Sequence, residues 1–104
     1  MKEIKEHVEH IVHMLETGFE NETNSDGEQM SAFDYLTDAL DIEYILNFQR
    51  EYIGARVLVA FGGPNIWINT RTNQVEGYWW NDSYTTSFSD NIGLDDALRE
   101  LFAC

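Results

Sequence analysis

The stretch from Tyr52 to Trp80 decides the fold class, and it reads YIGARVLVAFGGPNIWINTRTNQVEGYWW. Its apolar segments are separated by two short sequences, GGPN and RTN, whose glycine, proline and asparagine residues favour tight turns. We predict strands over residues 52–61, 66–70 and 74–80, because the connections between them are too short for a parallel crossover. The run VLVAF is apolar at every position, so the first of these strands should lie centrally in the sheet.

A further strand is predicted just before this stretch. Ile42, Tyr44, Leu46 and Phe48 alternate with polar residues, apart from Ile45, as expected for a half-buried strand. Together the four strands would form an antiparallel meander, because each connection is short. Residues 81–91 are polar and irregular, and a short strand near residues 84–88 is an open alternative.

Apolar residues at helical spacing predict three helices beside this sheet. The first spans residues 2–16 and should end near Gly18. The second spans residues 31–40, where Ser31 and Asp34 form a weak capping box, and the third spans residues 94–102. The residues expected to face inward are Ile4, Val8, Ile11, Val12, Leu15, Phe33, Leu36, Leu40, Leu94, Leu98, Leu101 and Phe102.

The predicted class is therefore α+β, with two N-terminal helices, a four-stranded antiparallel β meander and a C-terminal helix. The length of 104 residues suits a single acidic domain over residues 1–104. The N-terminal sequence MKEIKEHVEHIV has charges where a signal peptide would have an apolar segment. No apolar run approaches the ~20 residues of a membrane-spanning helix, so we expect a cytoplasmic protein.

Charge is the most unusual property of the sequence. Nineteen acidic residues against six basic residues give a formal net charge of −13. Eleven acids and no lysine or arginine lie between residues 6 and 49. Affinity for nucleic acid depends on basic groups that neutralise phosphates, so direct binding to nucleic acid is disfavoured, and so is an anionic membrane surface. A basic protein partner, or a cation, is favoured.

An acidic row is predicted along the second helix. Asp34, Asp38 and Asp41 recur at i, i+4 and i+7, on the side opposite to the apolar residues. Their spacing of ~5–6 Å along the helix is of the same order as that of phosphates along a nucleic-acid strand, so the row could occupy a basic nucleic-acid channel. A solvated acidic face without a specific role is the alternative. The candidate partner-binding residues are Asp34, Asp38, Asp41 and Glu43, with Glu20, Glu22, Asp26 and Glu28 from the preceding loop.

The second candidate surface is aromatic. Trp79 and Trp80 are adjacent in the sequence, so they should point to opposite faces of the sheet. Trp67, Tyr78 and Trp80 would then share one face, depending on the strand register. Either a helix covers this face, or the face is an exposed aromatic patch of the kind that dominates protein–protein interfaces.

The patterns for metal binding are weak. His7, His10 and His13 span ~120° of helix circumference, so we expect exposed side chains that do not converge on one ion. The segment Glu22–Gly27 is similar to the start of a calcium loop, but its twelfth position is Phe33 and not glutamate. A polar surface loop is the main interpretation of this segment, and weak calcium binding is the alternative.

Catalytic patterns are weak as well. Cys104 is the only cysteine and the last residue, which does not suit a held nucleophile. The sequence has neither GxSxG nor HExxH, and Gly62-Gly63 fits a hairpin turn, since no GxxxxGK[ST] motif is present. We expect a protein that is not an enzyme and that needs no metal or cofactor.

Two blocks of the sequence resemble a known group of proteins. The blocks are SAFDYLTDALDIEYIL, which begins at Ser31, and YIGARVLVAFGGPNIWINTRTNQVEGYWWNDS, which begins at Tyr52, and together they cover roughly residues 31–82. They are similar to small acidic proteins carried on plasmids, conjugative elements and phages of gut Firmicutes. Such proteins resemble anti-restriction and anti-CRISPR inhibitors, which block host nucleases by protein contact and often imitate DNA. The matching motifs look structural, mainly strands and turns, so they bear on family membership more than on mechanism.

We therefore expect a non-enzymatic inhibitor or adaptor from a mobile element that binds a basic nucleic-acid-handling protein, such as a CRISPR or restriction nuclease. The alternative is a protein-interaction or regulatory module of a mobile element that uses Trp67, Tyr78 and Trp80. A small-molecule or calcium sensor is a third option. Both a monomer and a dimer are compatible with the sequence.

Overall fold

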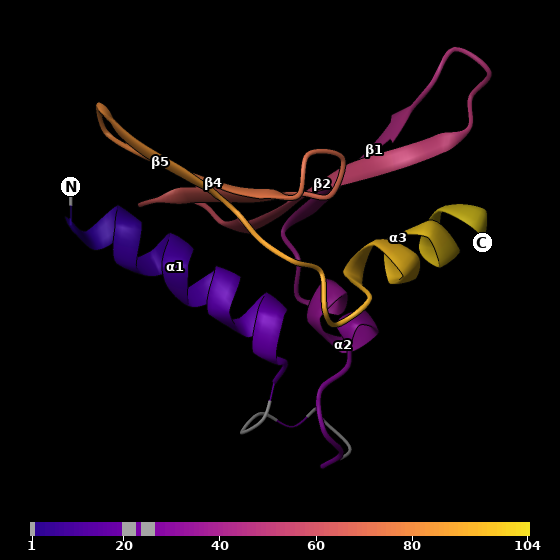
Figure 1. The fold of residues 1–104 in the computed structure, drawn as a ribbon, viewed down its shortest axis with the longest axis horizontal. Helices are drawn as coiled ribbons and strands as arrows, with labels where there is room; N and C mark the ends of the chain where they lie inside the picture. Colours follow the sequence, from indigo (N-terminus) through magenta and orange to yellow (C-terminus); the bar gives the residue numbers. More distant parts are fainter. Residues whose placement is uncertain (1, 20–22, 24–26) are drawn as a thin grey trace.

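The computed structural model describes residues 2–19, 23 and 27–104. The elements, in chain order, are α1 (Lys2–Thr17), α2 (Ala32–Thr37), β1 (Asp41–Leu46), β2 (Tyr52–Ala60), β3 (Asn65–Asn69), β4 (Gln74–Trp79), β5 (Asp82–Ser87) and α3 (Leu94–Ala103). Figure 1 shows two layers, with the strands in one layer and the helices together on one side of it. The predicted α+β class is confirmed.

The strands form one antiparallel sheet in the order β1-β2-β3-β4-β5, so the predicted meander is confirmed. The sheet has five strands and not the four predicted. The additional strand is β5, whose sequence DSYTTS lacks the apolar alternation that identifies a half-buried strand. The alternative of a strand near residues 84–88 was therefore the correct one, and the observed strand spans residues 82–87.

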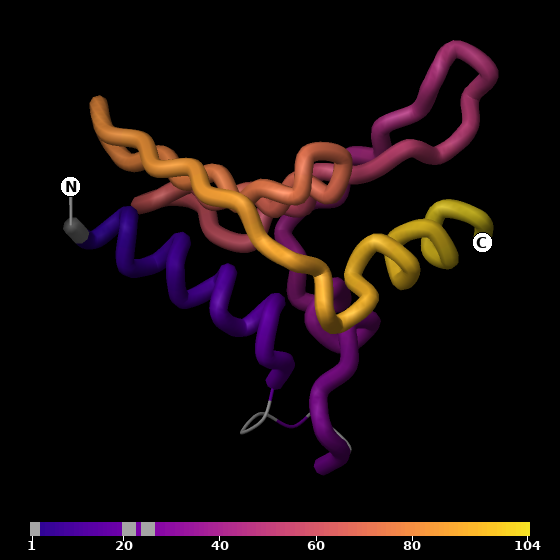
Figure 2. Tube along the Cα trace, viewed as in Figure 1, coloured from indigo at the N-terminus to yellow at the C-terminus, as the bar shows by residue number. Residues whose placement is uncertain are grey.

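The hairpin that joins β1 and β2 begins earlier than predicted. β1 ends at Leu46, and the Asn47 N–H then donates to the Glu51 carbonyl oxygen at 3.0 Å, which closes the turn. Phe48, which was expected in the strand, lies in this turn with 99% of its surface exposed. The hairpin extends past the neighbouring strands, on the side of the molecule where α3 and the C-terminus lie (Figure 2).

The hydrophobic core lies between the helices and one face of the sheet. Val57, Ile68 and Val75, from three neighbouring strands, are fully buried on this face. α1 packs across β4 and β5, and Gly77 of β4 makes room for it. A Cβ at this position would lie 2.5 Å from Val8 Cγ2. Of the residues expected to face inward from α1, Ile4, Val8 and Leu15 are buried, and Ile11 and Val12 are half-buried against the core.

The start of α2 is as predicted. Ser31 Oγ accepts a hydrogen bond from the Asp34 N–H at 3.2 Å, and Asp34 Oδ2 accepts one from the Ser31 N–H at 2.9 Å. These two bonds are the reciprocal bonds of a capping box, and they satisfy amide groups that have no partner within the helix. The predicted capping box is therefore confirmed.

The end of α2 differs from the prediction, which placed it at residue 40. The helix ends at Thr37, because the Leu40 N–H already donates to the Leu58 carbonyl oxygen of β2 at 2.9 Å. The chain has therefore joined the sheet where another turn of helix was expected. Leu36 is buried as predicted, whereas Phe33 and Leu40 are 42% and 59% exposed, so their predicted inward position is wrong.

α3 lies under β2 and begins with an unusual cap. Its N-cap residue is Gly93, which has no side chain to offer, and the Asp90 carboxylate accepts from the Leu94 and Asp95 N–H groups at 2.8 and 2.9 Å. The carboxylate also complements the positive end of the helix dipole. Of the residues expected inward, Leu94 and Leu98 are buried and Phe102 is half-buried, but Leu101 is 36% exposed.

Candidate functional site

The predicted acidic row does not form one face of a helix. Asp34 is half-buried and belongs to the capping box, Asp38 is the C-cap residue that follows α2, and Asp41 begins β1. The prediction is wrong because α2 ends at Thr37, before the second and third acids of the row. The comparison between a helical row and successive phosphates therefore does not apply to these residues.

The remaining predicted acids lie in different places. Glu43 lies in β1 and is exposed, two residues after Asp41. Glu28 is exposed in the segment that leads to α2. Glu20, Glu22 and Asp26 lie outside the described residues, as does most of the segment that is similar to a calcium loop. Of the predicted acids with a described position, Asp41 and Glu43 are the two that the sheet presents together.

The sheet face away from the helices has none of the described helices packed against it (Figure 1). The strand register places on this face Asp41, Glu43, Arg56, Leu58, Trp67, Glu76 and Tyr78, which we call the open face. Of the two possibilities for the aromatic surface, the one with a covering helix is therefore not observed in the described part of the chain. The acids of β1 and the aromatic residues of β3 and β4, predicted as separate surfaces, share this one face.

Arg56 lies in the middle of the open face. Its guanidinium group is 4.2 Å from the centroid of the Trp67 ring, a cation–π distance. The same group lies 3.1 Å from Glu76 Oε1 and 3.5 Å from Glu43 Oε1. The Glu76 side chain is only 14% exposed, whereas that of Glu43 is 54% exposed. The charge of Arg56 is therefore balanced mainly by Glu76, and Glu43 remains accessible to a partner.

Glu76 is the common hydrogen-bond acceptor of the polar groups around it. It accepts hydrogen bonds from Tyr78 Oη at 3.2 Å and from Asn69 Nδ2 at 3.3 Å, besides its contact with Arg56. Burial, and then the nearby charge of Glu76, raise the pKa of Tyr78 above its usual value. The phenol therefore keeps its proton, and continues to donate to Glu76, further into the alkaline range than a free tyrosine would. These bonds hold the Trp67 and Tyr78 end of the open face in a fixed arrangement.

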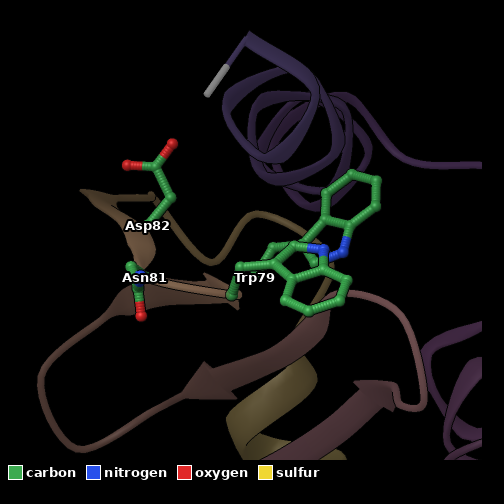
Figure 3. Close-up of a pocket in the computed structure, with 4 residues that line it drawn as sticks. Trp79, Asn81 and Asp82 are labelled. Atoms are coloured by element: carbon green, nitrogen blue, oxygen red, sulfur yellow. The ribbon is translucent and has the colours of Figure 1, made fainter.

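Trp80 does not lie on the open face, so this part of the aromatic prediction is wrong. β4 ends at Trp79, and Trp80 enters the turn with a positive φ of 57° and 86% of its surface exposed. A shallow pocket of about 300 Å³ lies at this turn, lined by Trp79, Trp80, Asn81 and Asp82 (Figure 3). Trp79 belongs to the helix side, where its ring centroid is 6.5 Å from that of His7.

Three residues of this site were not singled out in the sequence, namely Arg56, Asn69 and Glu76. Arg56 in β2 and Glu76 in β4 each lie between apolar or small residues of their own strand. In each strand this alternation indicates that the charged side chain lies on the face opposite to the core. Their pairing joins β2 to β4 across β3, so it depends on two strand registers at once. Those registers depend on the geometry of the two turns, which strand alternation alone does not give.

The arrangement offers binding contacts, namely carboxylates, aromatic surfaces and hydrogen-bonding groups. His7, His10 and His13 occupy exposed positions of α1. Among the residues that the structure describes, no three His, Cys, Asp or Glu side chains come together as metal ligands would. Within the same residues, no helix has both the length and the apolar character that a membrane crossing requires.

Comparison of the chain with known proteins does not assign it to a family. No family model, no curated protein and no solved structure matches it. The open face and the net charge are therefore the basis for a functional proposal.

Proposed function

We propose that this protein is a non-enzymatic inhibitor or adaptor that binds a basic, nucleic-acid-handling protein at that partner's nucleic-acid site. The observation that supports the proposal is the presence of exposed carboxylates, Asp41 and Glu43, beside Trp67 and Tyr78 on one uncovered sheet face. A channel that holds single-stranded nucleic acid has the complementary groups, since it combines cationic side chains for phosphates with surfaces for stacked bases. The net charge of −13 would speed encounter with such a partner.

Competition with nucleic acid is the proposed mechanism. Asp41 and Glu43 are alternate residues of one strand, so their side chains point the same way about 6–7 Å apart. That spacing is of the same order as the distance between neighbouring phosphates on one strand of nucleic acid. In the proposed imitation of DNA, Asp41 and Glu43 therefore replace the helical row of aspartates.

A CRISPR or restriction nuclease is the partner class to test first, because the sequence resembles small acidic proteins of mobile elements. The experiment measures the affinity of the intact protein for purified nucleases of both classes, and their cleavage of DNA in its presence. The double variant Asp41→Asn/Glu43→Gln should weaken binding by about tenfold, because two carboxylates that face basic groups become neutral. It should also flatten the fall of affinity with salt.

A matched control removes the same number of charges elsewhere. Glu6 and Glu9 occupy exposed positions of α1, on the other layer of the molecule, so Glu6→Gln/Glu9→Gln should change affinity by less than about threefold. Equal weakening by the two double variants would contradict a role for the open face. Failure of every nuclease tested to bind the wild-type chain would contradict the proposed function itself.

A second candidate function rests on the exposure of Tyr78 and Trp80, which are 41% and 86% exposed. These side chains would serve a protein-interaction or regulatory module of a mobile element. Binding through aromatic side chains tolerates salt, because it depends mainly on burial of apolar surface. In that case Trp80→Ala should abolish binding, and Asp41→Asn/Glu43→Gln should leave it almost unchanged.

A further inference from the structure

One edge of the sheet is open to another strand. β1 stands at the end of the strand order, so among the described strands only β2 pairs with it. Exposed edge strands are usually protected by charged side chains, lysine above all, by proline or by a bulge. The sequence of β1, DIEYIL, contains neither lysine nor proline, and its charged residues are the acids Asp41 and Glu43, which repel an acidic strand and attract a basic one. Its register shift lies between Ile45 and Leu46, so residues 41–45 keep a regular edge.

The side chains along this edge differ between its two faces. On the open face, Asp41 and Glu43 are exposed carboxylates. On the helix face, Tyr44 and Leu46 are 38% and 41% exposed, and Leu40, just before the strand, is 59% exposed. The edge therefore combines two acids with exposed apolar groups, beside a backbone that pairs with β2 alone among the described strands. The Ile42 N–H of this strand donates to Asp41 Oδ1 at 3.0 Å, and the other backbone groups of the edge are those that an added strand would pair.

We propose that β1 accepts an extended segment of the basic partner as a sixth strand of the sheet. This inference rests on the proposed function, because it assumes a partner rich in lysine and arginine. Basic side chains of the added strand would lie over Asp41 and Glu43, and apolar side chains on its other face would cover Tyr44 and Leu46. Opposite charges on neighbouring strands stabilise a sheet, and the backbone bonds of an added strand supply affinity.

A second copy of this chain is a poorer occupant of the same edge. Antiparallel pairing of β1 with itself would bring Asp41 and Glu43 close to the same acids of the other copy. Each copy also carries a formal net charge of −13, which opposes association. A basic segment has the complementary charge, and this complementarity identifies the occupant.

The opposite edge of the sheet does not share these features. β5 has the sequence DSYTTS, in which Asp82 is the one acid and side chains with a hydroxyl group occupy the other positions. α1 packs beneath β5, and Lys5 lies with its Nζ atom 5.8 Å from the centroid of the Tyr84 ring. A basic strand at the β5 edge would therefore lie near one acid and one lysine, whereas at the β1 edge it would lie beside two acids, Asp41 and Glu43.

The test uses a labelled peptide of about eight residues in which arginine and valine alternate, a length that matches a typical strand. Fluorescence anisotropy at about 0.15 M salt measures its affinity for the full chain. The control peptide has the same sequence with alternate backbone nitrogens methylated, which blocks strand pairing and keeps the charge. We expect the methylated peptide to bind more weakly by about tenfold or more, because it cannot make the backbone bonds of an added strand.

Protein variants locate the binding edge. Asp41→Lys/Glu43→Lys should weaken binding of the unmethylated peptide by about tenfold more than Glu6→Lys/Glu9→Lys, which makes the same charge change on α1. Because a lysine at position 43 would lie near Arg56, the milder variant Asp41→Asn/Glu43→Gln is measured beside it, with thermal melting as the check on folding. Amide hydrogen exchange should show added protection in residues 41–46 when the peptide is bound.

Three results would overturn the proposal. The first is equal binding of the methylated and unmethylated peptides, and the second is peptide-induced protection outside β1. The third is a dimer that forms without peptide and protects the amides of residues 41–46 from exchange, since the occupant would then be a second copy. The peptide assay contains no nuclease, so its failure overturns the added strand alone. Failure of nuclease binding overturns the partner class instead.

Discussion

Among single residues, Tyr52 connects strand β2 of the sheet to helix α3. Its Oη atom donates to Asp95 Oδ1 of α3 at 2.6 Å. Its ring packs against Tyr44 and Phe102, with centroid distances of 6.3 and 5.7 Å, and the Arg99 guanidinium lies 4.8 Å from the ring centroid. Burial first, and then the hydrogen bond to Asp95, raise the pKa of Tyr52 well above its usual value.

This raised pKa predicts a loss of stability in alkali. The folded protein holds the phenol proton more tightly than the unfolded chain, whose tyrosine titrates near pH 10. The stabilisation is therefore complete below about pH 10 and falls above it by up to about 1.4 kcal/mol per pH unit. Tyr52→Phe should lower the free energy of unfolding by about 1 kcal/mol at neutral pH and reduce the further loss in alkali. Urea unfolding near pH 9 and near pH 11 checks this, and an unchanged alkaline loss in the variant would contradict it.

Among the elements, those with marked ends were predicted well from the sequence. Strands β2, β3 and β4 were predicted because the turn residues around Gly62 and Asn73 mark the two connections between them. The boundary between α2 and β1 was missed because the aspartates repeat at helical spacing, whereas a bond from Leu40 to Leu58 decides the outcome. That bond joins segments far apart in the sequence, so no local pattern contains it.

The sequence identified individual residues of the candidate site, but it did not show that they form one surface. Asp41, Glu43, Trp67 and Tyr78 were all singled out from the sequence, yet their common face depends on the registers of β1 to β4. Trp80 was misplaced because strand alternation assumes an extended backbone, and this residue adopts a positive φ of 57°. Bulky residues seldom adopt that conformation, so the sequence predicts a continuing strand.

The contact between α1 and β4 predicts the effect of a single added methyl group. In Gly77→Ala the new Cβ would lie 2.5 Å from Val8 Cγ2 and 2.9 Å from Ile4 Cδ1, so α1 must move away from the sheet. The free energy of unfolding should fall by about 1–3 kcal/mol, as for other overpacked sites. Gly63→Ala is the control, because no atom lies within 4 Å of its added Cβ. Urea unfolding of both variants checks the prediction, and equal stability would show that α1 does not pack closely on Gly77.

On the scale of the whole molecule, charge acts on the fold and on binding in opposite directions. Residues 1–51 carry thirteen acids and three bases, and residues 52–104 carry six acids and three bases, which gives net charges of −10 and −3. Repulsion among these charges disfavours the compact state, whereas the same charges attract a basic partner. Added salt screens both effects, so it should stabilise the fold and weaken the complex.

These opposite effects of salt predict the outcome of two measurements, the melting temperature and the affinity for the basic partner. Raising the ionic strength from about 0.01 M to about 0.1 M shortens the Debye length from ~30 to ~10 Å, so repulsion within the chain decreases. A gain of about 1 kcal/mol in stability would raise the melting temperature by roughly 4–8 °C in a domain of this size. Over the same range, affinity for the basic partner should fall, because the screened charges are those that attract it.

Glu6→Gln/Glu9→Gln should reduce the effect of salt on melting, since it lowers the repulsion, and should leave the effect of salt on binding nearly intact. A melting temperature that falls with salt would mean that attractive pairs, such as Arg56 with Glu76, outweigh the net repulsion in this fold.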